Sequence, residues 1–293
     1  MQQNKSNTLT KTKNISKIPR SIIIPGKILQ YIAPSLATKY AIKLFKTPIK
    51  FRTPDREKMM AKSAQKEMVF IPELNKKVMV YTYGYSKRKV LLVHGWSGRG
   101  TQLYKIADKL LENGFMTISF DAPAHGRSEG KVTLMNEFIT VSKFLENKYG
   151  SFEIAIGHSL GGMAVLNSVK QGLTLKKVII IGSGDIITDI LRVFTSKLEL
   201  KEKMVKNMKN YFFKKIGYNI DSYSASVAAK SVKIPTLIVH DTEDREVPVS
   251  CAHNIRQNTK QGELLITNGL GHTRILKDNF VVKSIVEFIK RNP

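Results

Sequence analysis

The chain has 293 residues, which is long enough to bury a large core in one domain with an insertion. It carries 48 Lys and Arg against 23 Asp and Glu, a formal net charge of +25, so it either attracts anionic surfaces or has a generally lysine-rich exterior. The single cysteine, Cys251, excludes an intramolecular disulfide framework and a cysteine-cluster metal site, and no apolar run reaches the ~18–20 residues of a spanning helix. These features predict a cytoplasmic protein, with the inner face of the membrane as a peripheral location.

Residues 1–66 form a basic N-terminal arm with an amphipathic helix. Residues 1–20 are rich in Asn, Gln, Ser, Thr and Lys, a composition that predicts disorder. From Lys27 to Phe45 apolar residues recur at helical spacing, and Pro34 can divide that helix. The arm holds 15 Lys and Arg and only two acidic residues. Its apolar stripe can pack on the domain that follows or lie on an anionic membrane, and the sequence leaves both open. The residues expected to enter a bilayer are Leu29, Ile32, Leu36, Leu44 and Phe45.

Short strands and helices alternate through residues 67–184. The predicted strands are Met68–Ile71, Lys77–Tyr83, Val90–Val93, Met116–Phe120, Phe152–Ile156 and Lys177–Ile181. The predicted helices are Thr101–Asn113, Leu134–Lys148 and Leu160–Lys170. Nearly continuous apolar strands that alternate with helices indicate an α/β fold with a mainly parallel sheet covered on both faces.

The alternation is interrupted at residues 185–233, which contain helical patterns and no buried-strand run. This segment looks like a helical cap inserted into the domain, the kind of element that covers an active site. The second part of the core, residues 234–293, supplies the strands Pro235–His240 and Glu263–Thr267 and the closing helix Asn279–Arg291.

A G-x-S-x-G pentapeptide, from Gly157 to Gly161, joins a predicted strand to a predicted helix. In that context the serine occupies a sharp, strained turn, and its side chain projects above the carboxyl edge of the sheet. Ser159 is therefore the candidate nucleophile. The N–H of Leu160 would lie at a helix N-terminus, where backbone donors are free.

A serine nucleophile needs a base and an acid that orients the base. His272 follows the last strand in a glycine-flanked loop and is the histidine best placed to reach Ser159, whereas His158 is expected to point away. The segment after the preceding strand offers Asp241, Glu243 and Asp244 as acids. The chain order of serine, acid and histidine is that of an α/β-hydrolase.

Five motifs in this order make the chain similar to the α/β-hydrolase superfamily, of the serine esterase and lipase type, from about Val78 to Ile289. They are His94-Gly95-Trp96, Asp121 to Ser128, Gly157 to Gly162, Asp241 to Pro248, and Gly271-His272. The resemblance implies that Asp244 is the acid and that the N–H groups of Trp96 and Leu160 form the oxyanion hole. Asp241 stands where the family has glycine, so it remains a rival for the acid. The turn at His125 and Gly126 resembles a structural feature of the fold.

The resemblance implies a serine hydrolase that cleaves a carboxylic ester of an acyl or lipid-like substrate through an acyl-enzyme, without a metal or organic cofactor. A thioesterase or serine aminopeptidase-like hydrolase is the alternative within the fold. The alternative from another class is a basic membrane-surface binding protein on a hydrolase scaffold. A small-molecule substrate is the expected partner and nucleic acid is not. The sequence does not predict the oligomeric state.

Overall fold

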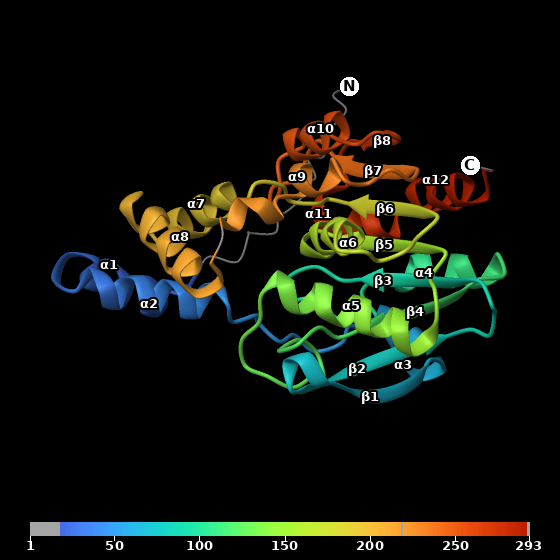
Figure 1. The fold of residues 1–293 in the computed structure, drawn as a ribbon, viewed down its shortest axis with the longest axis horizontal. Helices are drawn as coiled ribbons and strands as arrows, with labels where there is room; N and C mark the ends of the chain where they lie inside the picture. The colour runs from blue at the N-terminus through green and yellow to red at the C-terminus, as the bar shows by residue number, and fades with distance from the viewer. Residues whose placement is uncertain (1–17, 218, 292–293) are drawn as a thin grey trace, which may run out of the picture.

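The computed structural model describes residues 18–217 and 219–291, and its centre is one eight-stranded sheet (Figure 1). The spatial order is β1-β2-β4-β3-β5-β6-β7-β8. The strands are β1 (Gln65–Ile71), β2 (Lys76–Tyr83), β3 (Lys89–Val93), β4 (Met116–Phe120), β5 (Ile154–His158), β6 (Lys177–Ile181), β7 (Thr236–Asp241) and β8 (Gly262–Thr267). Only the β1–β2 and β2–β4 pairs are antiparallel, which confirms the predicted, mainly parallel sheet.

Helices cover both faces of the sheet. Those of the core are α3 (Lys58–Ser63), α4 (Tyr104–Glu112), α5 (Met135–Tyr149), α6 (Leu160–Lys170), α9 (Ala225–Ala229), α10 (Ser250–Gln257), α11 (Gly271–Arg274) and α12 (Asn279–Lys290). In β3, Leu91 and Val93 pack in the core under α5 and α6, whereas Val90 and Leu92 pack in the core under α4 and α12. This two-residue alternation explains why the central strands are apolar throughout.

The helical insertion predicted between the two parts of the core is present, between β6 and β7. It consists of α7 (Ile187–Lys197), α8 (Lys203–Ile216) and a 3-10 turn, η3 (Ile220–Tyr223), followed by α9, which packs against α6 in the main core. The carboxylate of Asp221 holds the insertion together. It accepts hydrogen bonds from the N–H of Thr188 at 2.8 Å, from the Thr188 hydroxyl at 2.6 Å and from the Lys209 ammonium at 2.9 Å.

Two N-terminal helices, α1 (Arg20–Ile32) and α2 (Pro34–Phe45), pack against this insertion rather than against the sheet. Helix α1 begins seven residues before the predicted start, because Ile23 is buried in the cluster that α1 and α2 share with α7 and α8, and this packing outweighs the cost of Pro25 inside the helix. Pro34 divides the two helices as predicted. Residues 1–17 of the segment predicted to be disordered lie outside the described residues.

The apolar stripe of the arm is divided between a buried face and an exposed face. Ala37, Ala41 and Ile42 are buried against α8, and the rings of Phe45 and Phe194 lie 5.1 Å apart. Leu29, Leu44 and Phe45, which were expected to enter a bilayer only under the membrane alternative, are partly buried in this cluster, so packing on the protein holds for these three residues. Within the described residues, no helix combines the length and the apolar character needed to cross a membrane.

Candidate active site

Ser159 lies between the last residue of β5 and the first residue of α6, with φ 54° and ψ −120°. This conformation is unfavourable for a residue with a Cβ and persists only where the surroundings enforce it. The surroundings are two glycines. A Cβ on Gly157 would lie 2.3 Å from the carbonyl oxygen of Gly161, and one on Gly161 would lie 2.2 Å from that of Val93. Only glycine at both positions lets the strand, the turn and the helix approach this closely.

The loop that follows β3 lies directly against this turn. A Cβ on Gly95 would be 2.9 Å from the Cβ of Ser159. Within residues 18–217 and 219–291, the N–H groups of Trp96 and Leu160 donate to no acceptor. Leu160 is the first residue of α6, so its N–H also carries the partial positive charge of a helix N-terminus. Both predicted oxyanion donors are therefore unpaired beside Ser159.

Two buried histidines support the loop after β3. The Nε2 of His94 accepts the N–H of Ala122 at 2.9 Å, and the Nε2 of His125 accepts the N–H of Ser97 at 3.0 Å. Burial lowers the pKa of His94 well below its usual range and lowers that of His125 to about 4. Both rings must be neutral to accept these bonds. Sequence reasoning gave the turn at His125 a structural role but did not predict its contact with Ser97.

The N-terminal arm also reaches this loop. The N–H of Ile49 donates to the Ser97 hydroxyl at 3.0 Å. The buried carboxylate of Glu57 accepts hydrogen bonds from Arg99 at 3.2 Å and from the Thr101 hydroxyl at 2.7 Å. Hence the segment after α2 is part of the support for the loop that carries the Trp96 N–H.

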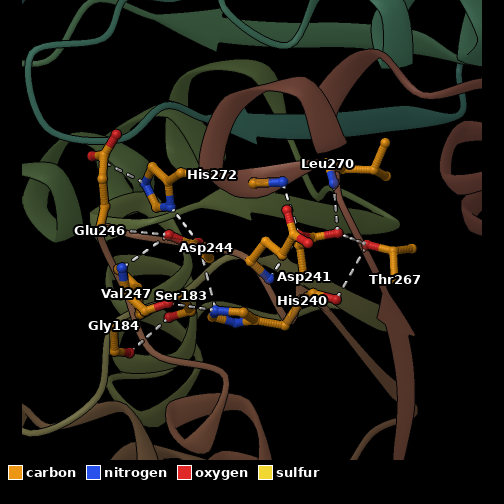
Figure 2. A network of polar contacts seen from close by, with 12 residues as sticks. Ser183, Gly184, His240, Asp241, Asp244, Glu246, Val247, Thr267, Leu270 and His272 are labelled. Carbon is orange, nitrogen blue, oxygen red and sulfur yellow. Dashed lines mark hydrogen bonds and ion pairs between the residues drawn. The ribbon is translucent and has the colours of Figure 1, made fainter. Parts of the chain in front are cut away.

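Asp244 and His272 form a buried pair (Figure 2). The Nδ1 of His272 lies 2.7 Å from the Oδ2 of Asp244, while Oδ1 of Asp244 accepts the N–H groups of Glu246 at 2.8 Å and Val247 at 2.9 Å. Burial alone would raise the pKa of Asp244, but the hydrogen bond from His272 and the two backbone donors outweigh it, so the pKa is lowered. Asp244 is held as a carboxylate that orients the His272 ring.

Asp241, the rival acid, is engaged elsewhere (Figure 2). Its carboxylate accepts the N–H groups of Leu270 at 3.0 Å and Gly271 at 2.8 Å, and the Thr267 hydroxyl at 2.7 Å. Leu270 and Gly271 immediately precede His272. Asp241 therefore fixes the backbone just before His272, whereas Asp244 contacts the imidazole of His272 itself.

His272 lies in a short helix, α11, and not in the open loop that the flanking glycines suggested. His158 does not point away from the site as expected: its Nε2 donates to the His272 carbonyl oxygen at 2.9 Å, and the two rings are 4.6 Å apart. This contact places His272 beside the serine turn. The structure does not join Ser159 to His272 by a hydrogen bond, and the His272 Nε2 lies 3.8 Å from the Glu246 carboxylate.

Two family models of this fold match the chain. The model described as the alpha/beta hydrolase fold matches residues 89–212, and the model of the TAP-like proteins of the same fold matches residues 219–291. The chain belongs to the α/β-hydrolase superfamily. A search of the curated proteins finds no match to the sequence.

Solved structures show the same fold at low sequence identity. The esterase EaEST from Exiguobacterium antarcticum is 17% identical with a TM-score of 0.60, over 78% of this chain and 100% of that chain. A membrane phospholipase A, described as a bacterial virulence factor, is 13% identical with a TM-score of 0.62, over 92% and 95%. The thioesterase domain of the curacin biosynthetic pathway is 14% identical with a TM-score of 0.56, over 78% and 99%. At these identities the likeness is one of fold.

The contacts of the two aspartates predict different effects of removing each charge. Asp244→Asn should lower kcat/KM for an ester by roughly 10³–10⁴-fold, because the amide disturbs the tautomer and orientation of His272. Asp241→Asn should retain much more activity and instead lower the free energy of unfolding by about 1–3 kcal/mol, because an amide nitrogen would face backbone donors. Steady-state kinetics and urea unfolding measure both; the reverse ranking of activities would transfer the role of the acid to Asp241.

The buried histidines predict an acid-labile fold. The pKa of His125 is lowered from 6.5 to about 4 by burial, and that of His158 to about 3 by burial and the neighbouring His272. As the pH falls below 6.5, the unfolded chain binds protons that the folded chain excludes, so stability decreases. Each of these two residues should remove on the order of 2 kcal/mol by about pH 5. Urea unfolding of the wild-type protein at about pH 7.5 and about pH 5 tests this loss of stability. His253→Gln, which replaces an exposed histidine, is the control and should lose as much stability as the wild-type protein. An equal free energy of unfolding at the two pH values would contradict the prediction.

Proposed function

We propose that this hydrolase cleaves a carboxylic ester of an acyl or lipid-like substrate through an acyl-enzyme on Ser159. The observation that carries the proposal is the Asp244–His272 pair beside a strained serine turn that has two unpaired backbone donors. Each part supplies what acyl transfer needs: a half-buried serine nucleophile, an oriented base, and donors for the charge that develops on the carbonyl oxygen.

The first half of the proposed reaction acylates the serine. His272 Nε2 takes the proton of the Ser159 hydroxyl as Oγ attacks the carbonyl carbon of the ester. The resulting oxyanion accepts hydrogen bonds from the N–H groups of Trp96 and Leu160. The Asp244 carboxylate stabilises the imidazolium through Nδ1. Collapse of the tetrahedral intermediate breaks the ester C–O bond, and His272 returns its proton to the leaving alcohol.

The second half hydrolyses the acyl-enzyme. Water loses a proton to His272 Nε2 and attacks the same carbonyl carbon, and the same two N–H groups accept the oxyanion. Collapse breaks the bond to Ser159 Oγ, which receives the proton from His272, and releases the carboxylic acid. Two exposed apolar side chains, Trp96 in the loop and Ile49 beside it, favour an apolar acyl group over a charged one. A cytoplasmic location remains a prediction from the single cysteine.

Ser159→Ala should lower the hydrolysis of p-nitrophenyl esters by several orders of magnitude with little change in melting temperature. A fluorophosphonate probe should label Ser159 in the wild-type protein and lose that label in Ser159→Ala and His272→Ala. Ser151→Ala, an exposed serine at the opposite end of β5, is the matched control and should keep full activity and labelling.

The choice of substrate separates the alternatives. A series of p-nitrophenyl esters of increasing chain length, an acyl thioester and an amino-acid anilide compares the three leaving groups. Preference for the thioester or the anilide would move the assignment to the other hydrolase classes. A folded protein that neither reacts with the probe nor cleaves any of these compounds would support the non-enzymatic alternative.

A further inference from the structure

Helix α1 is apolar on two sides, and the described part of the chain covers only one of them. Ile23 and Gly26 are buried, and a Cβ on Gly26 would lie 3.4 Å from Leu200. On the other side an apolar stripe follows the helical spacing i, i+4, i+7 and i+8 and consists of Ile24, Ile28, Tyr31 and Ile32. These four side chains are between 48% and 74% exposed. A continuous exposed stripe of this kind, unlike scattered apolar residues, indicates an interaction surface.

The stripe continues into α2. Leu36, in the first turn of α2, is 51% exposed. Figure 1 shows α1 and α2 at the end of the molecule that carries α7 and α8, far from α12 at the opposite end. Together, the stripe and Leu36 form the apolar face of the α1–α2 pair.

Basic side chains surround this face, and the acids near it are neutralised. Residues 18–46 contain five Lys and Arg and no acidic residue. The Lys201 ammonium lies 4.3 Å from the centre of the Tyr31 ring, which adds a cation from the insertion. The Glu199 carboxylate is paired with the Lys27 ammonium at 2.6 Å, so these two charges cancel. Lys39 and Lys43 are exposed one turn apart on α2.

We propose that this face binds an anionic lipid bilayer, with α1 lying in the plane of the headgroups. An apolar stripe bordered by lysine and arginine matches a surface that is apolar inside and negatively charged outside. Helix α1, with its 13 residues, is about 20 Å long and rests on the bilayer without crossing it. Tyr31 has the amphipathic ring that favours the interface. A second copy of the chain fits less well, because its own lysines would face these.

Docking in this way would hold the candidate site near the bilayer. The segment that directly follows α2 contacts the sheet domain through two hydrogen bonds. The carbonyl oxygen of Lys46 accepts the N–H of Thr133 at 2.9 Å, and the N–H of Ile49 donates to the Ser97 hydroxyl. Ile49 and Phe51 in this segment are also exposed. The binding surface and the loop beside Ser159 are thus joined by a few residues. The binding proposal itself does not depend on the proposed reaction.

The apolar part of the proposal is tested with vesicles and a charge placed in the stripe. The intact protein should co-sediment with vesicles of phosphatidylcholine containing about 30% phosphatidylglycerol, and much less with pure phosphatidylcholine. Ile28→Asp/Ile32→Asp should weaken this binding by at least about tenfold, because both side chains would leave the apolar layer. Phe280→Asp on α12, where the wild-type side chain is 61% exposed, is the matched control and should bind like wild type. Melting curves and turnover of a short soluble ester should be unchanged in all three proteins.

The electrostatic part is tested by charge reversal and salt. Lys39→Glu/Lys43→Glu should weaken binding by about tenfold or more at about 50 mM salt and have a smaller effect at about 500 mM, where charges are screened. Lys260→Glu, exposed just before β8 on the sheet domain, should leave binding unchanged.

Three results would overturn the proposal. One is equal binding, or no binding, of the intact protein to anionic and neutral vesicles. Another is wild-type vesicle binding by Ile28→Asp/Ile32→Asp. The last is an intact protein that is dimeric in light scattering, ignores vesicles, and becomes monomeric in that variant, which would assign the face to a second copy of the chain.

Discussion

The close contact between the start of α6 and the end of β3 is the constraint on which the candidate site depends. Gly161 leaves no room for a Cβ between α6 and β3, Gly157 leaves none between β5 and α6, and Gly95 brings the next loop against Ser159. This contact holds Ser159 in its strained conformation and brings the loop that carries Trp96 against the start of α6. The free-energy cost of the strained Ser159 backbone is offset by the packing of the large core around it.

Neutral histidines and ionised aspartates form the frame around this contact. His94 and His125 accept backbone N–H groups, which a protonated ring could not do, and burial keeps them neutral. Asp241 and Asp244 accept N–H groups and are kept ionised. These four side chains are thus each fixed in one protonation state by burial and by their hydrogen bonds, and the Nδ1 of His272 is held by Asp244.

Much of the fold could be predicted from the sequence because the signals are local. The apolar strands and the helix after Ser159 follow from periodicity, and Met116–Phe120, Lys177–Ile181 and Leu160–Lys170 match the structure at both ends. The fold class and the helical insertion were predicted from the alternation of strands and helices. What is confirmed is therefore the framework that brings Ser159, Asp244 and His272 to one edge of the sheet.

Features that depend on tertiary contacts could not be predicted. Asp241 and Asp244 lie in the same turn, and only the contacts of each carboxylate distinguish them. The contact of His158 with His272 joins residues 114 positions apart. For the N-terminal arm, the sequence leaves packing and an exposed membrane-binding face as alternatives, whereas α1 has both a packed and an exposed apolar face, because its isoleucines surround the helix.

In the proposed reaction, Ser159, His272 and two backbone donors act together on one carbonyl carbon. A crystal structure of the protein after reaction with an alkyl phosphonate ester tests this joint action most directly. Phosphorus should be bonded to Ser159 Oγ, and the phosphonyl oxygen should lie about 3 Å from the nitrogens of both Trp96 and Leu160. A phosphonate attached to another residue, or an oxygen directed away from both N–H groups, would contradict this assignment.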